Sequence, residues 1–426
     1  MHALAGPEDG VPAVPAPVSA PRPADRLVDV TAAPYDVPRT PGQFSDVDAT
    51  AGIQAALEDV AAAGGGVVYL PAGWYTVRGR LTVPAGVELR GSAGVANRDS
   101  LELSGGTVLM AYDGRRPARA AAAADRAPAF ITLAGEDAGV RGLRVLHPEN
   151  NPASDDGVIP YPYAVRGDAP GVYAVNVGLT NAWNGIDMTD AADGFLVRRA
   201  VGLAFAHLVR AGANDGGTVE NVLSNGNVIT RVAYGLPGWV EGANLFAQVI
   251  DGVSRQREVL VQADGARGLT VLNTFAYGSH DGIVARDGAT VMAFNVGTDN
   301  LGPGGYSADA DGNSAVDAVN LMRYNGTTSR GPVTITNPMA INMAQQSLTV
   351  VAEPAGSGTV RVLGNETEPG RYETGSTVRL VAEATAGFAH VGWKDESGQV
   401  VSTDPTLDLV LDADRSLVAA FEEATG

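Results

Sequence analysis

The chain has 426 residues, which is enough for two or three domains of average size. Hydrophobic residues make up 45%, charged residues 18% and aromatic residues 6%, and the 54 glycines favour many short strands with glycine turns over a helical bundle. The formal net charge of −19 disfavours nucleic acid and anionic membranes as partners, and the absence of cysteine excludes disulfides, thiolate metal sites and cysteine nucleophiles.

The N-terminal part predicts a tail followed by a helix. Residues 1–27 are rich in proline and alanine and are typical of an extended linker or tail. A helix is predicted after residues 46–48, where an aspartate can cap its start, and it ends at the glycines of 64–66. Its apolar face consists of residues at helical spacing, namely Ile53, Ala56, Leu57 and Val60.

The middle of the chain, residues 28–346, returns repeatedly to short alternating strands. Such segments recur at 140–145, 172–177, 219–222, 269–273 and 290–296. A repeat of about 20–30 residues built from short strands predicts a solenoid, in which each coil buries its apolar side against the next. We expect insertions where the pattern lapses, at 91–130, 147–160, 231–258 and 301–315. No apolar run reaches about 18 residues, so no transmembrane helix is predicted.

Residues 347–426 have a different pattern. Clean alternation of apolar and polar residues over 348–351, 377–381, 407–411 and 416–421 predicts a small, separate β-rich module.

Residues 44–91 resemble the opening of the pectate-lyase-like superfamily of right-handed parallel β-helices. The resemblance is carried by Ile53–Leu57 and by Ala63–Tyr75. It implies that the N-terminal helix caps the open end of the solenoid, which agrees with the physical need to cover an exposed strand edge. It leaves the chemistry open, because the superfamily includes glycoside hydrolases, lyases, transferases and phage tailspikes.

Two further resemblances cover other parts of the chain. His147–Asn150, Ile159–Gly167 and Asn181–Asp187 resemble an uncharacterised bacterial, carbohydrate-active branch of the same superfamily. Gly387–Trp393 and Val418–Phe421 resemble the repeat modules of bacterial surface proteins, among them the internalin B-type repeats. The second resemblance implies a spacer or an adhesive module.

Catalytic residues are predicted from an alignment of two coils. Glycoside hydrolysis usually needs two carboxylates, and equivalent positions on successive coils lie about 4.8 Å apart. Matching the Gly-Ile pairs of Trp183–Met188 and Ser279–Val284 places Asn184 in the column of Asp281. The predicted catalytic residues are Asp187, His280, Asp281 and Asp299. The alternative is structural, because Asn and Asp beside Gly are common turn residues.

Substrate-binding residues are predicted where aromatic, amide and charged side chains lie near these acids or near insertions. Aromatic faces stack on the C–H surfaces of sugars, and polar groups bind hydroxyls. The predicted residues are Tyr161, Tyr163, Arg166, Trp183, Asn184, Arg210, Trp239, Glu241 and Arg286. The alternative for the two tyrosines is that they only pack the wall of an insertion.

The sequence predicts no cofactor, with Ca²⁺ as the alternative. Asp309 and Asp311 are the weak candidates for metal ligands, because hard cations require several oxygen ligands. A solvated acidic loop explains the same residues.

Together these observations predict an all-β protein, a right-handed parallel β-helix with an N-terminal capping helix and a small C-terminal β-rich domain. The predicted function is a secreted or cell-surface glycoside hydrolase, or a related glycan-rearranging enzyme, which acts on a polysaccharide or oligosaccharide through paired carboxylates. A Ca²⁺-dependent polysaccharide lyase and a non-catalytic, adhesive glycan-binding protein are the alternatives. No nucleic-acid partner and no membrane insertion are expected. The oligomeric state stays open, and a homotrimer is one arrangement that the resemblance implies.

Overall fold

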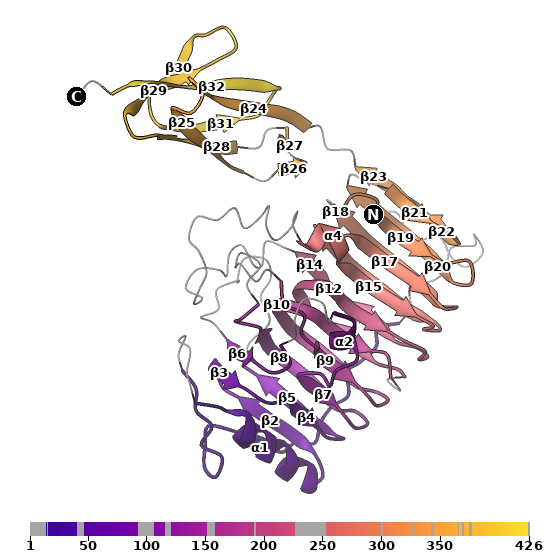
Figure 1. Ribbon diagram of the computed structural model, residues 1–426. Helices are drawn as coiled ribbons and strands as arrows, with labels where there is room; N and C mark the ends of the chain where they lie inside the picture. The colour runs from indigo at the N-terminus through magenta and orange to yellow at the C-terminus, as the bar shows by residue number, and fades with distance from the viewer. Residues whose placement is uncertain are drawn as a thin grey trace. The chain divides into compact units, whose positions relative to one another are not determined.

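The computed structural model describes most of the chain. The described residues are 14, 16–40, 47–92, 106–115, 121–150, 158–190, 193–225, 253–299, 301–324, 327–341, 345–364, 366–368, 370–374 and 377–424. The chain divides into two compact units, Met1–Ala340 and Ile341–Gly426 (Figure 1). Both units consist mainly of β-strands. No helix within the described ranges is long and apolar enough to cross a membrane.

The strands of the first unit pair in parallel and form three faces, which we name A, B and C. Face A contains β1 (Leu27–Asp29), β2 (Gly66–Leu70), β5 (Val87–Gly91), β8 (Gly139–Leu146), β10 (Tyr173–Met188), β11 (Leu196–Arg198), β13 (Thr218–Glu220), β16 (Leu269–Tyr277), β18 (Thr290–Asp299), β20 (Ala315–Tyr324) and β22 (Val333–Thr336).

Faces B and C contain further strands and the continuations of the long ones. Face B adds β3 (Gly73–Val77), β6 (Thr107–Ala111), β12 (Val201–Ala211), β14 (Leu223–Asn225) and β23 (Met339–Ile341). Face C contains β4 (Leu81–Val83), β7 (Ile131–Leu133), β9 (Tyr163–Gly167), β15 (Val259–Asp264), β17 (Asp281–Arg286), β19 (Tyr306–Ala310) and β21 (Thr327–Arg330), together with the ends of β10 and β12.

The chain passes from face A to face B to face C and then returns to face A one strand further along. The first coil shows this order, because β2, β3 and β4 lie on successive faces and β5 pairs with β2. Some strands bend around the corners, and β10 contributes to all three faces. Figure 1 shows the resulting stack of parallel strands. The sequence repeats therefore correspond to stacked coils.

Apolar columns run through the interior of the stack. On face A, one column of mutually paired residues continues from β2 to β22, and it consists of Val68, Leu89, Val140, Ala174, Val197, Val219, Val271, Ala293, Ala318 and Ile335. On face C, a matching column consists of Leu81, Ile131, Val165, Ile186, Val209, Val261, Ile283 and Ala308. Each coil therefore buries its apolar residues only against its neighbours, as a solenoid requires.

Helix α1 (Thr50–Ala62) packs at the beginning of this interior. Its buried residues belong to the same core as the first coils, and they are the four that the sequence predicts, Ile53, Ala56, Leu57 and Val60. The side chain of Asp48 accepts a hydrogen bond of 3.0 Å from the backbone N–H of Thr50. Gly64 and Gly65, both at positive φ, follow the end of the helix.

The second unit contains two antiparallel or mixed sheets. The larger sheet has the order β26 (Glu366–Glu368), β27 (Arg371–Glu373), β24 (Gln345–Glu353), β32 (Arg415–Glu423), β29 (Phe388–Lys394), β30 (Val400–Ser402). The smaller sheet has the order β25 (Gly358–Leu363), β28 (Thr377–Ala384), β31 (Thr406–Val410). Trp393 is fully buried among Tyr372, Leu380 and Phe421, and its indole N–H donates to the carbonyl of Asp404 at 2.8 Å.

Two predicted insertions contain coil strands. The region 301–315 includes β19, which pairs with β17 on face C, and the region 91–130 includes β6, which pairs with β3 on face B. The prediction that these two regions are insertions is therefore wrong for β6 and β19. Polar residues before and after short strands concealed the apolar residues that face the core, such as Ala308 and Leu109.

The corner between faces A and B carries a ladder of asparagine side chains. Asn273, Asn295, Asn320 and Asn337 all have φ between 50° and 59°. Each amide donates to the preceding one, with distances of 2.9, 2.8 and 2.7 Å along the series. Asparagine tolerates the left-handed backbone of this corner and also links successive coils through its side chain.

A carboxyl group is buried inside the solenoid. Glu258 is fully inaccessible and accepts hydrogen bonds from the hydroxyls of Ser224 (2.8 Å) and Ser279 (3.0 Å) and from the N–H of Ala204 (3.2 Å). All three donors are neutral, so none of them compensates a negative charge. Burial raises the pKa of Glu258 from 4.5 to about 8.

Replacement of Asn295 should separate two effects on stability: the loss of its side-chain hydrogen bonds and the cost of a Cβ in a left-handed backbone conformation. Asn295→Ala removes two side-chain hydrogen bonds and leaves a Cβ in a left-handed conformation, so we expect a loss of about 1–2 kcal/mol in the free energy of unfolding. Asn295→Gly loses the same bonds but tolerates the conformation and should lose less. Urea denaturation of both variants measures the difference. A glycine variant that is no more stable than the alanine variant would show that the left-handed backbone conformation at this position does not affect stability.

Replacement of Glu258 should change how stability depends on pH. Between about pH 4.5 and 8 the unfolded chain releases this proton while the folded chain retains it, so the carboxyl contributes stability that falls as the pH rises through this range. Glu258→Gln removes the contribution. The difference in melting temperature between the wild type and the variant should shift in favour of the variant from pH 5 to pH 8.5. A difference that is constant with pH would show that Glu258 is ionised in the folded protein.

Candidate functional site

Two outward-facing columns of polar residues run along face C. They flank the buried column that contains Ile186 and Val209: along each strand, the first column lies two residues before it and the second lies one residue after it. The first outer column follows the pairing of Tyr163, Asn184, His207, Val259 and Asp281. The second outer column follows the pairing of Arg166, Asp187, Arg210, Gln262, Val284, Asp309 and Arg330.

A hollow of about 420 Å³ lies over the first coils of these columns. Its wall includes residues from α2 (Ala121–Asp125), from the second outer column, from the turns that follow β10 and β12, and from the end of β15. The lining residues are Asp125, Arg126, Arg166, Asp187, Thr189, Asp190, Arg210, Gly212, Ala213 and Asp264. The hollow is therefore lined by carboxylates and guanidinium groups, with two small residues that leave space between them.

Arg166 holds one side of the hollow together. Its Nε donates to Oδ2 of Asp187 at 2.8 Å, and its terminal nitrogens donate to the carbonyls of Asp125 (2.9 Å) and Ala127 (3.1 Å). The other oxygen of Asp187 accepts from the N–H of Thr189 at 3.1 Å. Arg166 therefore links α2 to the strand that carries Asp187.

Asp187 is a buried carboxylate at the base of the hollow. It is 1% exposed, and burial raises its pKa, while the neighbouring Arg166 acts in the opposite direction. A carboxyl group that retains a proton more readily than usual is suited to proton transfer.

Arg210 and Asp264 form the opposite side. Nε of Arg210 donates to Oδ2 of Asp264 at 2.7 Å, and the amide of Gln262 donates to Oδ1 at 2.6 Å. The Tyr163 hydroxyl lies beside Arg210 and contributes to its raised pKa. Asp264 is thus held by two donors in a fixed orientation at the edge of the hollow.

A chain of polar contacts extends from the hollow into the first outer column. The amide of Asn184 donates to Oδ1 of Asp125 at 2.8 Å, and its oxygen lies 3.3 Å from Nδ1 of His207. Burial lowers the pKa of His207, so its imidazole is neutral at neutral pH. A neutral imidazole can accept a proton or bind a hydroxyl.

The structure brings five of the predicted residues to the hollow or beside it, namely Asp187, Arg166, Arg210, Tyr163 and Asn184. Tyr161 and Trp183 lie at a neighbouring corner. The Tyr161 hydroxyl donates to Glu149 at 3.0 Å, and Trp183 is 5% exposed with Arg257 over its ring at 5.3 Å. Neither residue lines the hollow.

The predicted acids do not form one group. Asn184 and Asp281 share the first outer column, as the alignment of the two coils predicts. Three strand spacings of about 4.8 Å, roughly 14 Å in total, separate them. Asp187 lies in the other outer column, so Asp187 and Asp281 do not face one another across a single bond. His280 Nδ1 lies 2.7 Å from Asp281, whose other oxygen accepts from the N–H of Tyr306.

Asp299 lies on a different face. It ends β18 and is in register with Tyr277 and Tyr324 on face B, whereas the hollow is on face C. Trp239 and Glu241 lie outside the described residues.

The two residues that the sequence offers as weak candidates for metal ligands, Asp309 and Asp311, have hydrogen-bond partners of their own in the protein. Asp309 pairs with Arg286 and with Arg330, whose Nε donates to it at 2.8 Å. Asp311 accepts from the backbone N–H groups of Asp287 and Asn313 and thereby orders a turn. Within the described ranges, no group of three or more His, Asp or Glu residues could hold a metal ion.

Sequence reasoning missed several residues at the site, among them Asp264, His207 and Asp125. Asp264 could have been found by aligning 259–264 with 281–286, which places it in register with Arg286. His207 occupies a coil between the two that were aligned. Asp125 gave no such signal, because it comes from a helix outside the coil pattern.

The comparisons with known proteins agree with both units. The sequence model of the family described as divergent InlB B-repeat domain matches residues 348–425, which confirms the predicted resemblance of this module. No curated protein sequence matches the chain significantly.

Solved structures resemble the coils. A DFA-IIIase variant from Arthrobacter chlorophenolicus A6, in complex with DFA-III, has a TM-score of 0.50 at 14% identity and covers 78% of this chain and 80% of its own. An alginate lyase from Paenibacillus sp. str. FPU-7 has a TM-score of 0.40 at 14% identity, with 67% and 96% covered. A tailspike protein of Acinetobacter baumannii bacteriophage Fri1, a capsular polysaccharide depolymerase, has a TM-score of 0.37 at 10% identity and covers 94% of this chain and 85% of its own. The chain is thus similar in fold to the DFA-IIIase variant, and its C-terminal module is similar to the divergent InlB B-repeat domain.

Proposed function

We propose that this chain is a secreted or cell-surface carbohydrate-active enzyme that binds a glycan in the face-C hollow and cleaves or rearranges a glycosidic bond there. In this proposal the coils form a right-handed parallel β-helix closed at its start by α1. The observation that carries the proposal is the hollow itself, in which carboxylates and guanidinium groups converge. The imidazole of His207 is linked to it through Asn184 and Asp125.

The lining fits a sugar better than it fits an apolar ligand. Carboxylates bind hydroxyl groups, and Asp125 and Asp190 of the lining offer such groups. Strand-borne side chains fixed by ion pairs lose little conformational entropy when they bind a ligand. The resemblance of the fold to proteins that act on carbohydrates agrees with this ligand class.

The proposed chemistry uses two carboxyl groups in different roles. Asp187, which is buried and has a raised pKa, donates a proton to the oxygen of the leaving sugar. Asp264, oriented by Arg210 and Gln262, accepts a proton from the attacking water. Arg166 positions Asp187 and restores its hydrogen bond after the transfer.

Two alternatives remain as proposals of different classes. A lyase would use the neutral imidazole of His207 as the base. The guanidinium groups, or a bound Ca²⁺, would neutralise the carboxylate of a uronate.

A non-catalytic, adhesive glycan-binding protein is favoured by the match of residues 348–425 to the divergent InlB B-repeat domain. A homotrimer stays a prediction.

The test is the digestion of a glycan panel, with products read by mass spectrometry and by absorbance of unsaturated uronates. We expect cleavage without that absorbance. Asp187→Asn should reduce the rate at least about 100-fold, because proton transfer contributes about 10²–10⁴-fold to such reactions. The reaction should be indifferent to EDTA.

Asp281→Asn and Asp311→Asn are the matched controls, since both remove a carboxylate from face C or its turns but outside the hollow. They should retain the wild-type rate. Loss of activity in Asp281→Asn with full activity in Asp187→Asn would place the chemistry outside the hollow. A product that absorbs, formed only without EDTA, would favour the lyase, and binding without cleavage would favour the adhesive protein.

A further inference from the structure

The charged groups that line the face-C hollow are unequal in number. Among the described residues, the lining contains four aspartates and three arginines, namely Asp125, Asp187, Asp190, Asp264, Arg126, Arg166 and Arg210. How these groups pair with one another decides which charge a ligand meets when it enters the hollow.

Two of the three arginines already have a counter-charge. Nε of Arg166 donates to Oδ2 of Asp187 at 2.8 Å, and Nε of Arg210 donates to Oδ2 of Asp264 at 2.7 Å. All four side chains are at most 30% exposed, so solvent screens these pairs only in part. A carboxylate of a ligand would have to compete with a protein aspartate at either guanidinium. Neither arginine therefore offers an uncompensated positive charge to an acidic ligand.

The remaining lining residues leave an excess of acid. Asp125 and Asp190 face a single further guanidinium, that of Arg126. Arg126 and Asp190 are exposed, whereas Asp125 is partly buried and accepts a hydrogen bond of 2.8 Å from the neutral amide of Asn184. The described lining therefore carries a net negative charge, which repels an anion that approaches the hollow.

The carboxyl groups around the hollow also act on one another. Burial raises the pKa of Asp168, Arg166 opposes this rise, and Asp190 and Asp187 add to it. Burial likewise raises the pKa of Asp187, again against the effect of Arg166. A further negative charge on a ligand would act on these carboxyl groups in the same direction as their acidic neighbours. A bound anion would therefore disfavour the ionised form of the carboxyl groups that surround it.

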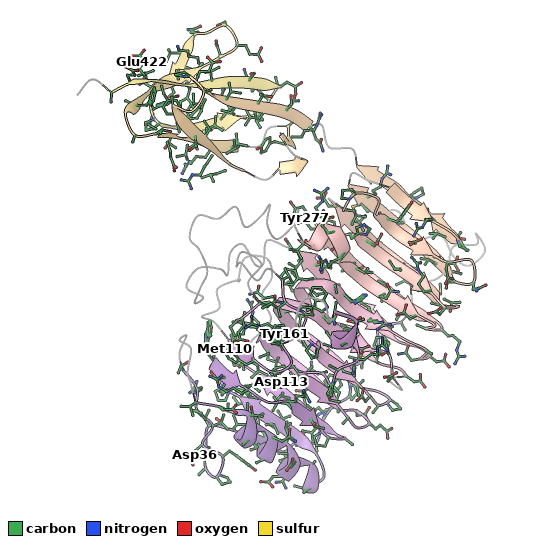
Figure 2. The ribbon with its side chains drawn as sticks, viewed as in Figure 1. Asp36, Met110, Asp113, Tyr161, Tyr277 and Glu422 are labelled. Carbon is green, nitrogen blue, oxygen red and sulfur yellow. The ribbon has the colours of Figure 1, made fainter. Side chains whose placement is uncertain are left out.

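The hollow has room for a ligand and offers hydrogen-bonding groups to it. Its volume of about 420 Å³ lies within the range of about 300–1,000 Å³ that is usual for small-molecule sites. No aromatic ring occurs among the lining residues that the structure describes, and Tyr161, which Figure 2 labels, is fully buried outside the lining. The carboxylate oxygens of Asp125 and Asp190 can accept hydrogen bonds from hydroxyl groups. Hydroxyl groups, rather than a stacked ring, are therefore what this lining can recognise.

We infer that the hollow is selective for an uncharged glycan, which it recognises through hydroxyl groups, and that its excess of aspartate excludes sugars with carboxylate or sulfate groups. Asp190 and Asp125 determine this selectivity, because no arginine of the described lining remains to balance both of them. The inference rests on the proposed function, since it requires that the hollow binds a glycan, and it names the class of that glycan.

The experiment compares uncharged and acidic glycans on the full chain, with binding read by calorimetry and cleavage by mass spectrometry. Oligosaccharides of glucan, mannan, galactan and fructan form the neutral set, and those of alginate, polygalacturonate and hyaluronan form the acidic set. Each acidic sample is also tested after chemical reduction of its carboxyl groups to primary alcohols, which removes the charge and keeps the linkages. We expect binding in the neutral set, and in the acidic set only after reduction. The affinity for a neutral ligand should change less than about twofold between roughly 0.05 and 0.5 M NaCl, because the ligand has no charge to screen.

Reversal of one charge tests whether the hollow itself determines the selectivity. Asp190→Lys should raise the affinity for acidic glycans relative to neutral ones at least about fivefold, because it replaces the excess of acid with an excess of base. Asp317→Lys is the matched control. It changes the net charge of the chain equally, but Asp317 is exposed on β20 of face A. Its relative affinity should equal that of the wild type.

The outcomes separate this inference from the proposed function. An acidic glycan that binds, and that no longer binds once its carboxyl groups are reduced, would overturn the inference while the proposed function stands. An equal rise in relative affinity in Asp190→Lys and Asp317→Lys would assign the selectivity to the net charge of the chain and overturn the role of the hollow. A chain that binds and cleaves no member of either set would overturn the proposed function, and the inference with it.

Discussion

The parallel pairing of successive coils is the constraint on which the rest of the structure depends. Backbone hydrogen bonds fix the register, and every residue then lies about 4.8 Å from its equivalents in the coils before and after it. The unbroken columns from Val68 to Ile335 and from Leu81 to Ala308 are direct consequences. A substitution at one position therefore acts on two neighbours at once, in the core, at the corners and on the surface.

The same constraint determines where charges can lie. Two like charges at adjacent positions of an outer column would be forced together, so acids and bases alternate along face C. Arg166, Asp187 and Arg210 are consecutive in the second outer column, and Asp309 lies next to Arg330 in the same column. The ion pairs that form the hollow therefore also stabilise the stack. The exposed Arg330, farther along the same column, contributes little. The residues that form these ion pairs therefore serve both the proposed function and the packing of the coils.

Sequence reasoning could predict what depends on the repeat alone. The apolar period gives the coils, and the paired Gly-Ile motifs place Asn184 and Asp281 in one column. It could not give the number of coils between the two motifs, so it did not show that Asp187 and Asp281 are too far apart to share one bond. It also could not assign Asp125 to the site, because this residue reaches the hollow from α2, outside the repeat.

The two faces differ in how their arginines are compensated, and this difference has a physical origin in the register. On face C the coils next to Arg166 and Arg210 supply aspartates at or near the paired positions, so the protein completes its own ion pairs. On face B the pairing positions of Arg144 hold Val108 and Gly178, neither of which carries a charge. A solenoid cannot shift one side chain to another coil without losing its register. Within the described residues the charge of Arg144 is therefore left without a counter-charge, and burial lowers the pKa of its guanidinium for this reason.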